Sequence, residues 1–312
     1  MTYEFFKKAI REAVQSRLPE GCETQLHTIL KNNGTCLDAL IIRESQKNIS
    51  PTIYLRQFYQ EYQNGAHLEQ LANHILSLYE QHRFNNRIDL SPFQDFHSIK
   101  SSIVFRLINY KENEELLQDI PHIPYLDLAI VFYYLFSTDS ATSPALFQDN
   151  CASMLIHNHL LSYWHITQEQ LFLVASRNTP KLFPHKLCNL TDLVDEYLLS
   201  HDLSEKGEFC NEDLENDLPI YVLTNDRQIH GAGCMLYSKL LEKYAEKWHR
   251  DLYVIPSSIH EVLLVPDNKN TSSQELEQIV REVNATQVEQ EDFLSNHVYY
   301  FSRTAGQLTL PG

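Results

Sequence analysis

Residues 253–267 read YVIPSSIHEVLLVPD, two apolar runs separated by a short polar cluster. Each run has the length and the β-branched content of a buried strand, and the Pro-Ser-Ser between them is typical of a turn. We therefore predict two core strands, Leu252–Ile255 and Glu261–Val265, on either side of the cluster. The second half of the chain is expected to fold around this pair.

The polar cluster contains the candidate catalytic residues Ser258, His260 and Glu261. Nucleophilic catalysis by a hydroxyl needs an imidazole within hydrogen-bond reach, and a carboxylate can orient that imidazole. Because alternate residues of a regular strand share a face, Ser258 and His260 form the better pair. The sequence has no G-x-S-x-G motif, which most serine hydrolases of the α/β class use. The other interpretation is a turn in which His260 and Glu261 bond to backbone groups.

The segment His157-Asn-His159 is a candidate metal site. The residues from Ala152 to His157 predict a strand, and on its continuation the two imidazoles would share a face and could chelate Zn²⁺ or Fe²⁺. A third ligand at close spacing is missing, and the chain has 15 histidines, so chance alternation is the competing interpretation. The sequence shows no cofactor signature, and we expect no cofactor.

Gly231-Ala-Gly233 precedes a predicted helix, Ser238–Trp248. Backbone N–H groups at a helix N-terminus that have no partner within the helix can bind phosphate. However, the sequence matches neither the dinucleotide-binding glycine pattern nor the P-loop pattern. A crowded turn that admits only glycine is the preferred interpretation. Asn225, Asp226 and Arg227 are predicted to be turn residues beside it.

The first ninety residues predict a small lobe of a helix, a hairpin and two helices. The hairpin strands are Thr24–Leu30 and Thr35–Ile42, and the Asn33-Gly34 pair between them supplies the positive φ that a tight turn requires. The serine and proline at residues 50–51 predict a helix start, with serine as the cap. A second helix is expected over residues 66–81.

A polar, turn-rich segment around residues 83–92 predicts a boundary between domains 1–90 and 91–312. Beyond it, Ser102–Tyr110 and Leu126–Phe136 predict strands, the second so apolar that it should be central. Thr167 begins a capping box that opens a helix, and Asn178-Thr-Pro180 should end it. The predicted fold class is α+β, with a small helix-hairpin-helix lobe and a larger mixed-sheet lobe with flanking helices.

The formal net charge is −16, with −5 in residues 1–150 and −11 in residues 151–312. Nucleic acids and anionic membranes attract basic surfaces, so we expect neither direct nucleic-acid binding nor membrane binding. No apolar run reaches the roughly 20 residues that cross a bilayer. Ten acidic residues from Asp192 to Asp217, against one lysine, predict an exposed acidic loop that could dock a basic protein. An acidic inhibitor of a nucleic-acid-binding protein is another interpretation.

Six cysteines are scattered through the chain without a C-x-x-C pair: Cys22, Cys36, Cys151, Cys188, Cys210 and Cys234. The first residues predict an amphipathic helix and not a secretory signal peptide. Scattered thiols without an export signal indicate a reducing compartment. The expected localisation is cytoplasmic.

Several blocks of the sequence resemble an uncharacterised bacterial family with a domain of unknown function. The blocks are YVLTN at residues 221–225, GAGCMLY at 231–237, PSSIHEVLLVP at 256–266 and HVYY at 297–300. The opening helix and residues 166–178 are similar to the same family. The order of elements also resembles a second uncharacterised family of cytoplasmic bacterial proteins. The resemblance implies a bacterial cytoplasmic α+β protein and brings no activity or catalytic residue with it.

A globular chain without a complete catalytic signature is expected to be an accessory or regulatory protein that acts through protein binding. Tyrosines at helical spacing, including Tyr59 and Tyr62, would suit a protein partner if exposed. The alternative function is a hydrolase that uses the Ser258/His260 neighbourhood.

Overall fold

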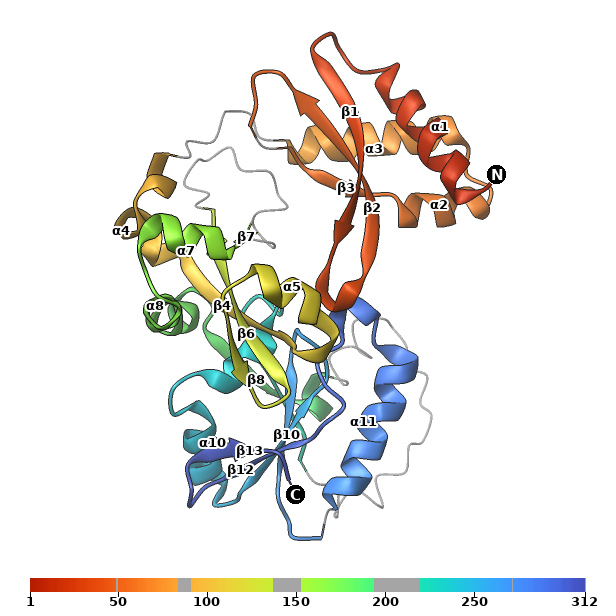
Figure 1. Ribbon diagram of the computed structural model, residues 1–312. Coiled ribbons are helices and arrows are strands. Elements are labelled where there is room, and N and C mark those ends of the chain that lie inside the picture. Colours follow the sequence, from red (N-terminus) through yellow and green to blue (C-terminus); the bar gives the residue numbers. More distant parts are fainter. Residues whose placement is uncertain (49, 84–90, 137–152, 194–218, 271, 312) are drawn as a thin grey trace. The chain divides into compact units, whose positions relative to one another are not determined.

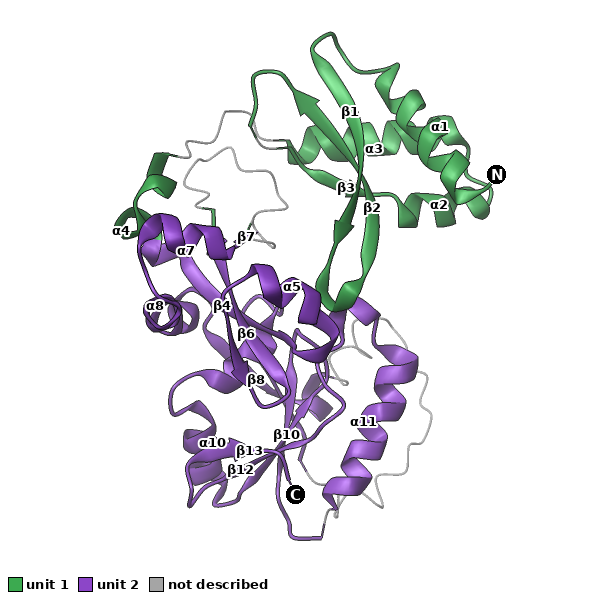
Figure 2. Ribbon diagram, in the orientation of Figure 1, with its two compact units in different colours: residues 1–99, 135–153 green, residues 100–134, 154–312 purple. Residues whose placement is uncertain are grey.

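The protein has a mixed α+β fold with three antiparallel sheets among the described residues. The computed structural model describes residues 1–48, 50–83, 91–136, 153–193, 219–270 and 272–311 (Figure 1). The chain divides into two compact units (Figure 2). Unit 1 comprises residues 1–99 and 135–153, and unit 2 comprises residues 100–134 and 154–312. The chain therefore passes from unit 1 to unit 2 near residue 99, and residues 135–153 belong to unit 1.

Unit 1 is built from a three-stranded sheet with helices packed on one face. Its elements are α1 Tyr3–Gln15, β1 Cys22–Leu30, β2 Cys36–Glu44, β3 Thr52–Tyr54, α2 Arg56–Gln63, α3 Leu68–His82 and α4 Phe96–Ile99. The sheet has the order β1-β2-β3, and all its pairs are antiparallel.

The β1–β2 hairpin has the turn that its sequence predicts. Asn33 and Gly34 both have positive φ, 56° and 67°, which is the conformation that an Asn-Gly pair accepts most easily. The resulting register places Leu26 opposite Leu40 and Thr24 opposite Ile42. Leu40 and Ile42 pack in one core with Phe6, Ile10 and Val14 of α1 and with Leu71 and Ile75 of α3, and Leu26 packs against this core.

The helix start predicted at residues 50–51 is wrong. Thr52 and Ile53 instead form β3, which pairs with β2 along Ile41–Ala39, and α2 begins only at Arg56. β-Branched residues next to an open strand edge gain ladder hydrogen bonds that a helix start cannot offer them.

Unit 2 contains two antiparallel sheets and the helices around them. Up to residue 182 its elements are β4 Ile103–Asn109, α5 Glu114–Asp119, β5 His122–Tyr125, β6 Leu128–Leu135, β7 Ser153–Leu155, α7 Asn158–Trp164 and α8 Gln168–Leu182, and β6 and β7 each include one residue of unit 1. The next elements are β8 His185–Asn189, β9 Tyr221–Asn225, the 3-10 helix Gly231–Leu236, α10 Leu240–Trp248 and β10 Leu252–Pro256. They are followed by β11 Val262–Pro266, α11 Ser273–Gln287, the 3-10 helix Gln290–Asp292, β12 Tyr299–Ser302 and β13 Gln307–Thr309.

The smaller sheet is centred on β6, which confirms that this apolar segment is a central strand. β6 lies between β4 and β5 and also pairs with β7. The helix α8 packs on β4 and opens with the predicted capping box, since Thr167 Oγ1 accepts from Gln170 N at 3.3 Å. The predicted end of α8 at residues 178–180 is wrong, because the helix continues through Pro180 to Leu182. Asn178 and Thr179 hold this last turn by hydrogen bonds to the backbone around β4.

The larger sheet has the order β13-β12-β10-β11-β9-β8. The expected mixed sheet is wrong, since every pairing described in it is antiparallel. Parallel strands need crossover connections of a dozen or more residues. The central pair β10 and β11 is instead joined by the five-residue turn 257–261, which returns the chain at once.

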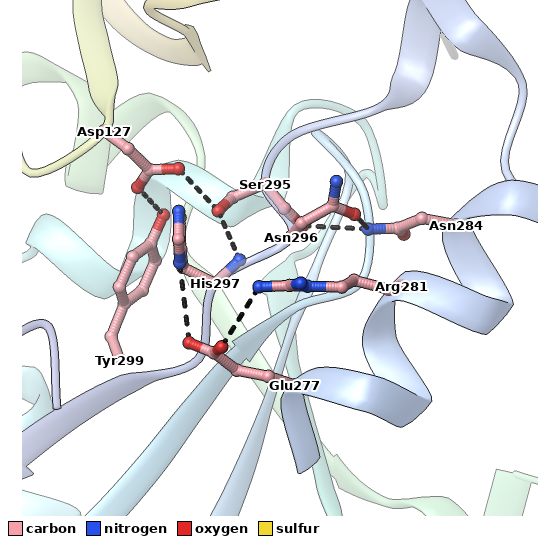
Figure 3. A network of polar contacts seen from close by, with 8 residues as sticks. All are labelled: Asp127, Glu277, Arg281, Asn284, Ser295, Asn296, His297 and Tyr299. Carbon is pink, nitrogen blue, oxygen red and sulfur yellow. Dashed lines mark hydrogen bonds and ion pairs between the residues drawn. The ribbon is translucent and has the colours of Figure 1, made fainter. Parts of the chain in front are cut away.

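A half-buried carboxylate joins the two sheets of unit 2. Asp127, in the β5–β6 turn, accepts hydrogen bonds of 2.6 Å from Ser295 Oγ and from Tyr299 OH on β12. Figure 3 shows this contact continuing into a polar network that includes His297, Glu277 and α11. Tyr299 and Ser295 are fully buried. Burial and then the Asp127 carboxylate raise the pKa of Tyr299 well above its usual value, so its hydroxyl stays protonated and donates.

No helix among the residues that the structure describes is both long and apolar enough to span a bilayer. The cysteines in those residues, Cys22, Cys36, Cys188 and Cys234, are unpaired thiols.

Replacement of Tyr299 by Phe is expected to destabilise unit 2 by about 1–2 kcal/mol, because it removes a buried donor to Asp127. The matched control is Tyr300→Phe on the same strand, whose hydroxyl bonds to Asp251 and Asp267 in a less buried place. Urea unfolding, followed by circular dichroism, measures the free energy of unfolding of both variants. Equal losses in the two variants would contradict the role given to Asp127.

Candidate functional site

The candidate site is the turn between β10 and β11. It does not continue the strands: Ser258 N donates to Glu261 O at 3.3 Å, which closes residues 258–261 into a turn. The premise that Ser258 and His260 alternate along a regular strand is therefore wrong. The proline at the end of β10 has no N–H for the ladder, which favours leaving the strand at this point.

The side chain of Ser258 bonds to Glu261 and not to an imidazole. Ser258 Oγ donates to Glu261 Oε1 at 3.0 Å and accepts from His260 N at the same distance. Only 8% of Ser258 is exposed. The structure thus brings the three predicted residues together in one turn, but it pairs the hydroxyl with the carboxylate.

The imidazole of His260 is held by residues that the sequence did not reveal. Its Nδ1 accepts from His230 N at 3.2 Å, so Nε2 carries the proton and donates to Asp292 Oδ1, also at 3.2 Å. Asp292 O also accepts from Ile259 N at 2.8 Å. Asp292 ends the 3-10 helix Gln290–Asp292, and no local pattern links it to His260, 32 residues earlier in the chain.

Gly231 fits a space that excludes any side chain. A Cβ at this position would lie 2.2 Å from Thr224 Oγ1, 2.5 Å from His260 O and 2.7 Å from Asn225 N. Thr224 Oγ1 donates to His260 O at 2.8 Å, and both atoms border the space that a Cβ of Gly231 would occupy. The interpretation of Gly231 as a glycine required by crowding is confirmed.

The loop before Gly231 is shaped by Asn225, the last residue of β9. Its Oδ1 accepts from Arg227 N at 3.0 Å, and its Nδ2 donates to Ile229 O at 2.8 Å. Asp226 and Arg227 are turn residues, as predicted, whereas the same prediction for Asn225 is wrong, because this residue ends β9. Further along, burial raises the pKa of Cys234 to about 12, so this thiol stays protonated and packs as a small apolar side chain.

A pocket of about 450 Å³ lies beside the turn, within unit 2. Its lining includes Ser258, His260 and Glu261 of the turn. Cys188 of β8 and Val222 of β9, which are cross-strand partners, also line it. Leu193, Thr224 and Gln228 complete the lining.

Glu261 brings an uncompensated negative charge to this pocket. Its carboxylate accepts from Ser258 Oγ, and within the described part of the chain no ion pair reaches it. As the orienter of a catalytic histidine, that carboxylate would have to contact an imidazole, and it accepts from the Ser258 hydroxyl instead. The arrangement is better suited to binding a cationic group.

A comparison with known families matches residues 3–303 to a family of unknown function, DUF5688. The chain belongs to the DUF5688 family. No curated protein and no solved structure matches it. Three of the sequence blocks that resemble the family meet at the site of this DUF5688 protein: β9, the 3-10 helix that begins at Gly231, and the 257–261 turn.

The candidate metal ligands of the DUF5688 protein lie elsewhere in unit 2. The expected strand ends at Leu155, and His157 is the residue before α7, with His159 in its first turn. The two rings stack with centroids 5.7 Å apart, but they do not share a strand face. No group of three metal-binding side chains occurs in the part of the chain that the structure describes. Residue 152 of the predicted strand falls outside it.

Gly231→Ala is expected to destabilise the DUF5688 protein by about 2 kcal/mol or more, because the new methyl group meets backbone atoms that cannot move independently. The matched control is Gly233→Ala, whose Cβ would meet the Phe105 ring at 3.2 Å. A ring can shift by a few tenths of an ångström, so the control should lose less than about 1 kcal/mol. Chemical denaturation measures the free energy of unfolding of the two variants. A smaller loss of stability in Gly231→Ala than in Gly233→Ala would contradict the crowding around Gly231.

Proposed function

We propose that this DUF5688 protein is an accessory or regulatory protein that acts by binding another protein. The proposed contact is the pocket beside the 257–261 turn, which receives a lysine or arginine side chain of the partner. The observation that carries the proposal is the Glu261 carboxylate, which lines the pocket without an ion pair from the described residues.

The pocket has the chemistry that a long basic side chain requires. Leu193 and Val222 provide apolar walls, along which the methylene stem of lysine or arginine can lie. Glu261 stands at the turn, where it can accept from the charged end. The net charge of −16 supports the same class of partner, because an acidic protein accelerates the approach of a basic one.

The hydrogen bonds of the turn favour binding over hydrolysis. Ser258 Oγ donates to Glu261, and both nitrogens of the His260 ring are occupied by His230 and Asp292. A hydrolase that uses Ser258 would have to turn the hydroxyl toward a free imidazole nitrogen. This alternative predicts turnover of an ester or amide that is lost in Ser258→Ala.

The interpretation as an acidic inhibitor rests on the net charge of −16, and of the acid-rich residues 192–217 that contribute to it, 194–217 lie outside the described part of the chain. It makes a separate prediction, since such an inhibitor would compete with DNA or RNA for its target.

Glu261→Gln is expected to weaken the binding of a lysine-containing peptide by about tenfold or more, because a charge-assisted hydrogen bond is replaced by a neutral one. The substitution keeps an oxygen that can accept from Ser258. Isothermal titration calorimetry with acetyl-Gly-Lys-Gly-amide measures the affinity, and the same peptide with acetyl-lysine supplies the neutral comparison.

The matched control is Glu246→Gln, which removes the same charge from an exposed position on α10 that does not line the pocket. It should change the affinity by less than about twofold. The proposal fails if the charged and the acetylated peptides bind equally, or if the two variants lose affinity equally.

A further inference from the structure

The outer face of the unit 1 sheet forms a second pocket, of about 380 Å³. Thr24 and Leu26 of β1 point inward to the helices, so Gln25 and His27 lie on the opposite face. Ile41 and Arg43 of β2 share that outer face. The connection from β2 to β3 adds Lys47, Asn48 and Ser50 to the lining.

This lining consists mainly of hydrogen-bond donors. Arg43 and Lys47 are cationic, the His27 ring is beside them, and Ile41 is the apolar side chain in the set. Among the described residues that form the pocket, none is acidic. The charged side chains of this lining are positive, in contrast to the chain as a whole, whose formal charge is −16.

Arg43 is the main source of unbalanced charge in the pocket. Lys47 is paired with Glu44 at 2.7 Å. Arg43 is exposed, and no acidic side chain of the described residues forms an ion pair with it. Its cross-strand partner Glu23 is on the same face of the hairpin, but the two charges do not meet in an ion pair. The five N–H donors of the guanidinium are therefore available to a ligand.

We propose that this pocket binds the phosphate group of a small phosphate monoester. A guanidinium donates two parallel hydrogen bonds to phosphate oxygens, and a second cation and neutral donors around it favour a dianion over a carboxylate. Gln25 Oε1 lies 3.2 Å from His27 Nε2, so this contact does not use the two N–H donors of the Gln25 side chain. The volume accommodates a phosphate together with a small organic group, which contacts Ile41.

The site is distinct from the one beside Glu261. It lies in unit 1, it has the opposite charge, and its ligand is a small anion and not a basic side chain. A failure of either proposal leaves the other unaffected, because the two are tested with different ligands and different variants.

Isothermal titration calorimetry of the full-length protein with phenyl phosphate tests the proposal, with benzoate as the carboxylate comparison. Phenyl phosphate is expected to bind, and Arg43→Gln should weaken it by about tenfold or more. Glu23→Gln should strengthen it by about twofold, because a nearby negative charge is removed. This second variant keeps the test valid if Arg43→Gln unfolds the protein.

The matched control is Arg11→Gln on α1, a helix that packs on the inner face of the sheet. It removes the same charge and should change the affinity by less than about twofold. The proposal is overturned if phenyl phosphate does not bind, if benzoate binds as tightly, if Arg11→Gln weakens binding as much as Arg43→Gln, or if Glu23→Gln weakens it.

Discussion

The close approach of the Gly231 backbone to His260 is the constraint on which the candidate site depends. A single methyl group would not fit between Gly231 and the carbonyl oxygen of His260. Because the same carbonyl accepts from Thr224, the backbone of the turn is fixed against the end of β9. The ring of His260 can then reach the N–H of His230 on one side and Asp292 on the other. The hydrogen bonds of the His260 ring therefore depend on this close packing at Gly231.

Much of the fold could be predicted because the relevant forces are local. The turn at Asn33 and Gly34 follows from the φ angles that these residues accept, and the capping box at Thr167 follows from two reciprocal hydrogen bonds within four residues. The central position of β6 follows from its unbroken apolar run. That Ser258, His260 and Glu261 lie together in the structure could be predicted for a similar reason, since they are close in the sequence.

The parts that could not be predicted depend on residues far apart in the chain. Thr52 joins a sheet edge that no local pattern reveals, and α8 continues through Pro180 because its last turn is bonded to the backbone beside β4. Asp127 and Asp292 each bind partners that are 32 or more residues away. Side chains alternate between two faces only in a regular strand. Alternation therefore predicted Ser258 and His260 on one strand face, whereas the chain turns at these residues.

We propose that the 257–261 turn is a binding site in which Ser258 supports Glu261 and does not act as a nucleophile. The most direct measurement is treatment of the native protein with a fluorophosphonate, which phosphonylates activated serine hydroxyls, followed by peptide mass spectrometry. The account predicts that Ser258 remains unmodified under conditions that label a serine hydrolase completely. Stoichiometric modification of Ser258 would contradict it and would establish the hydrolase.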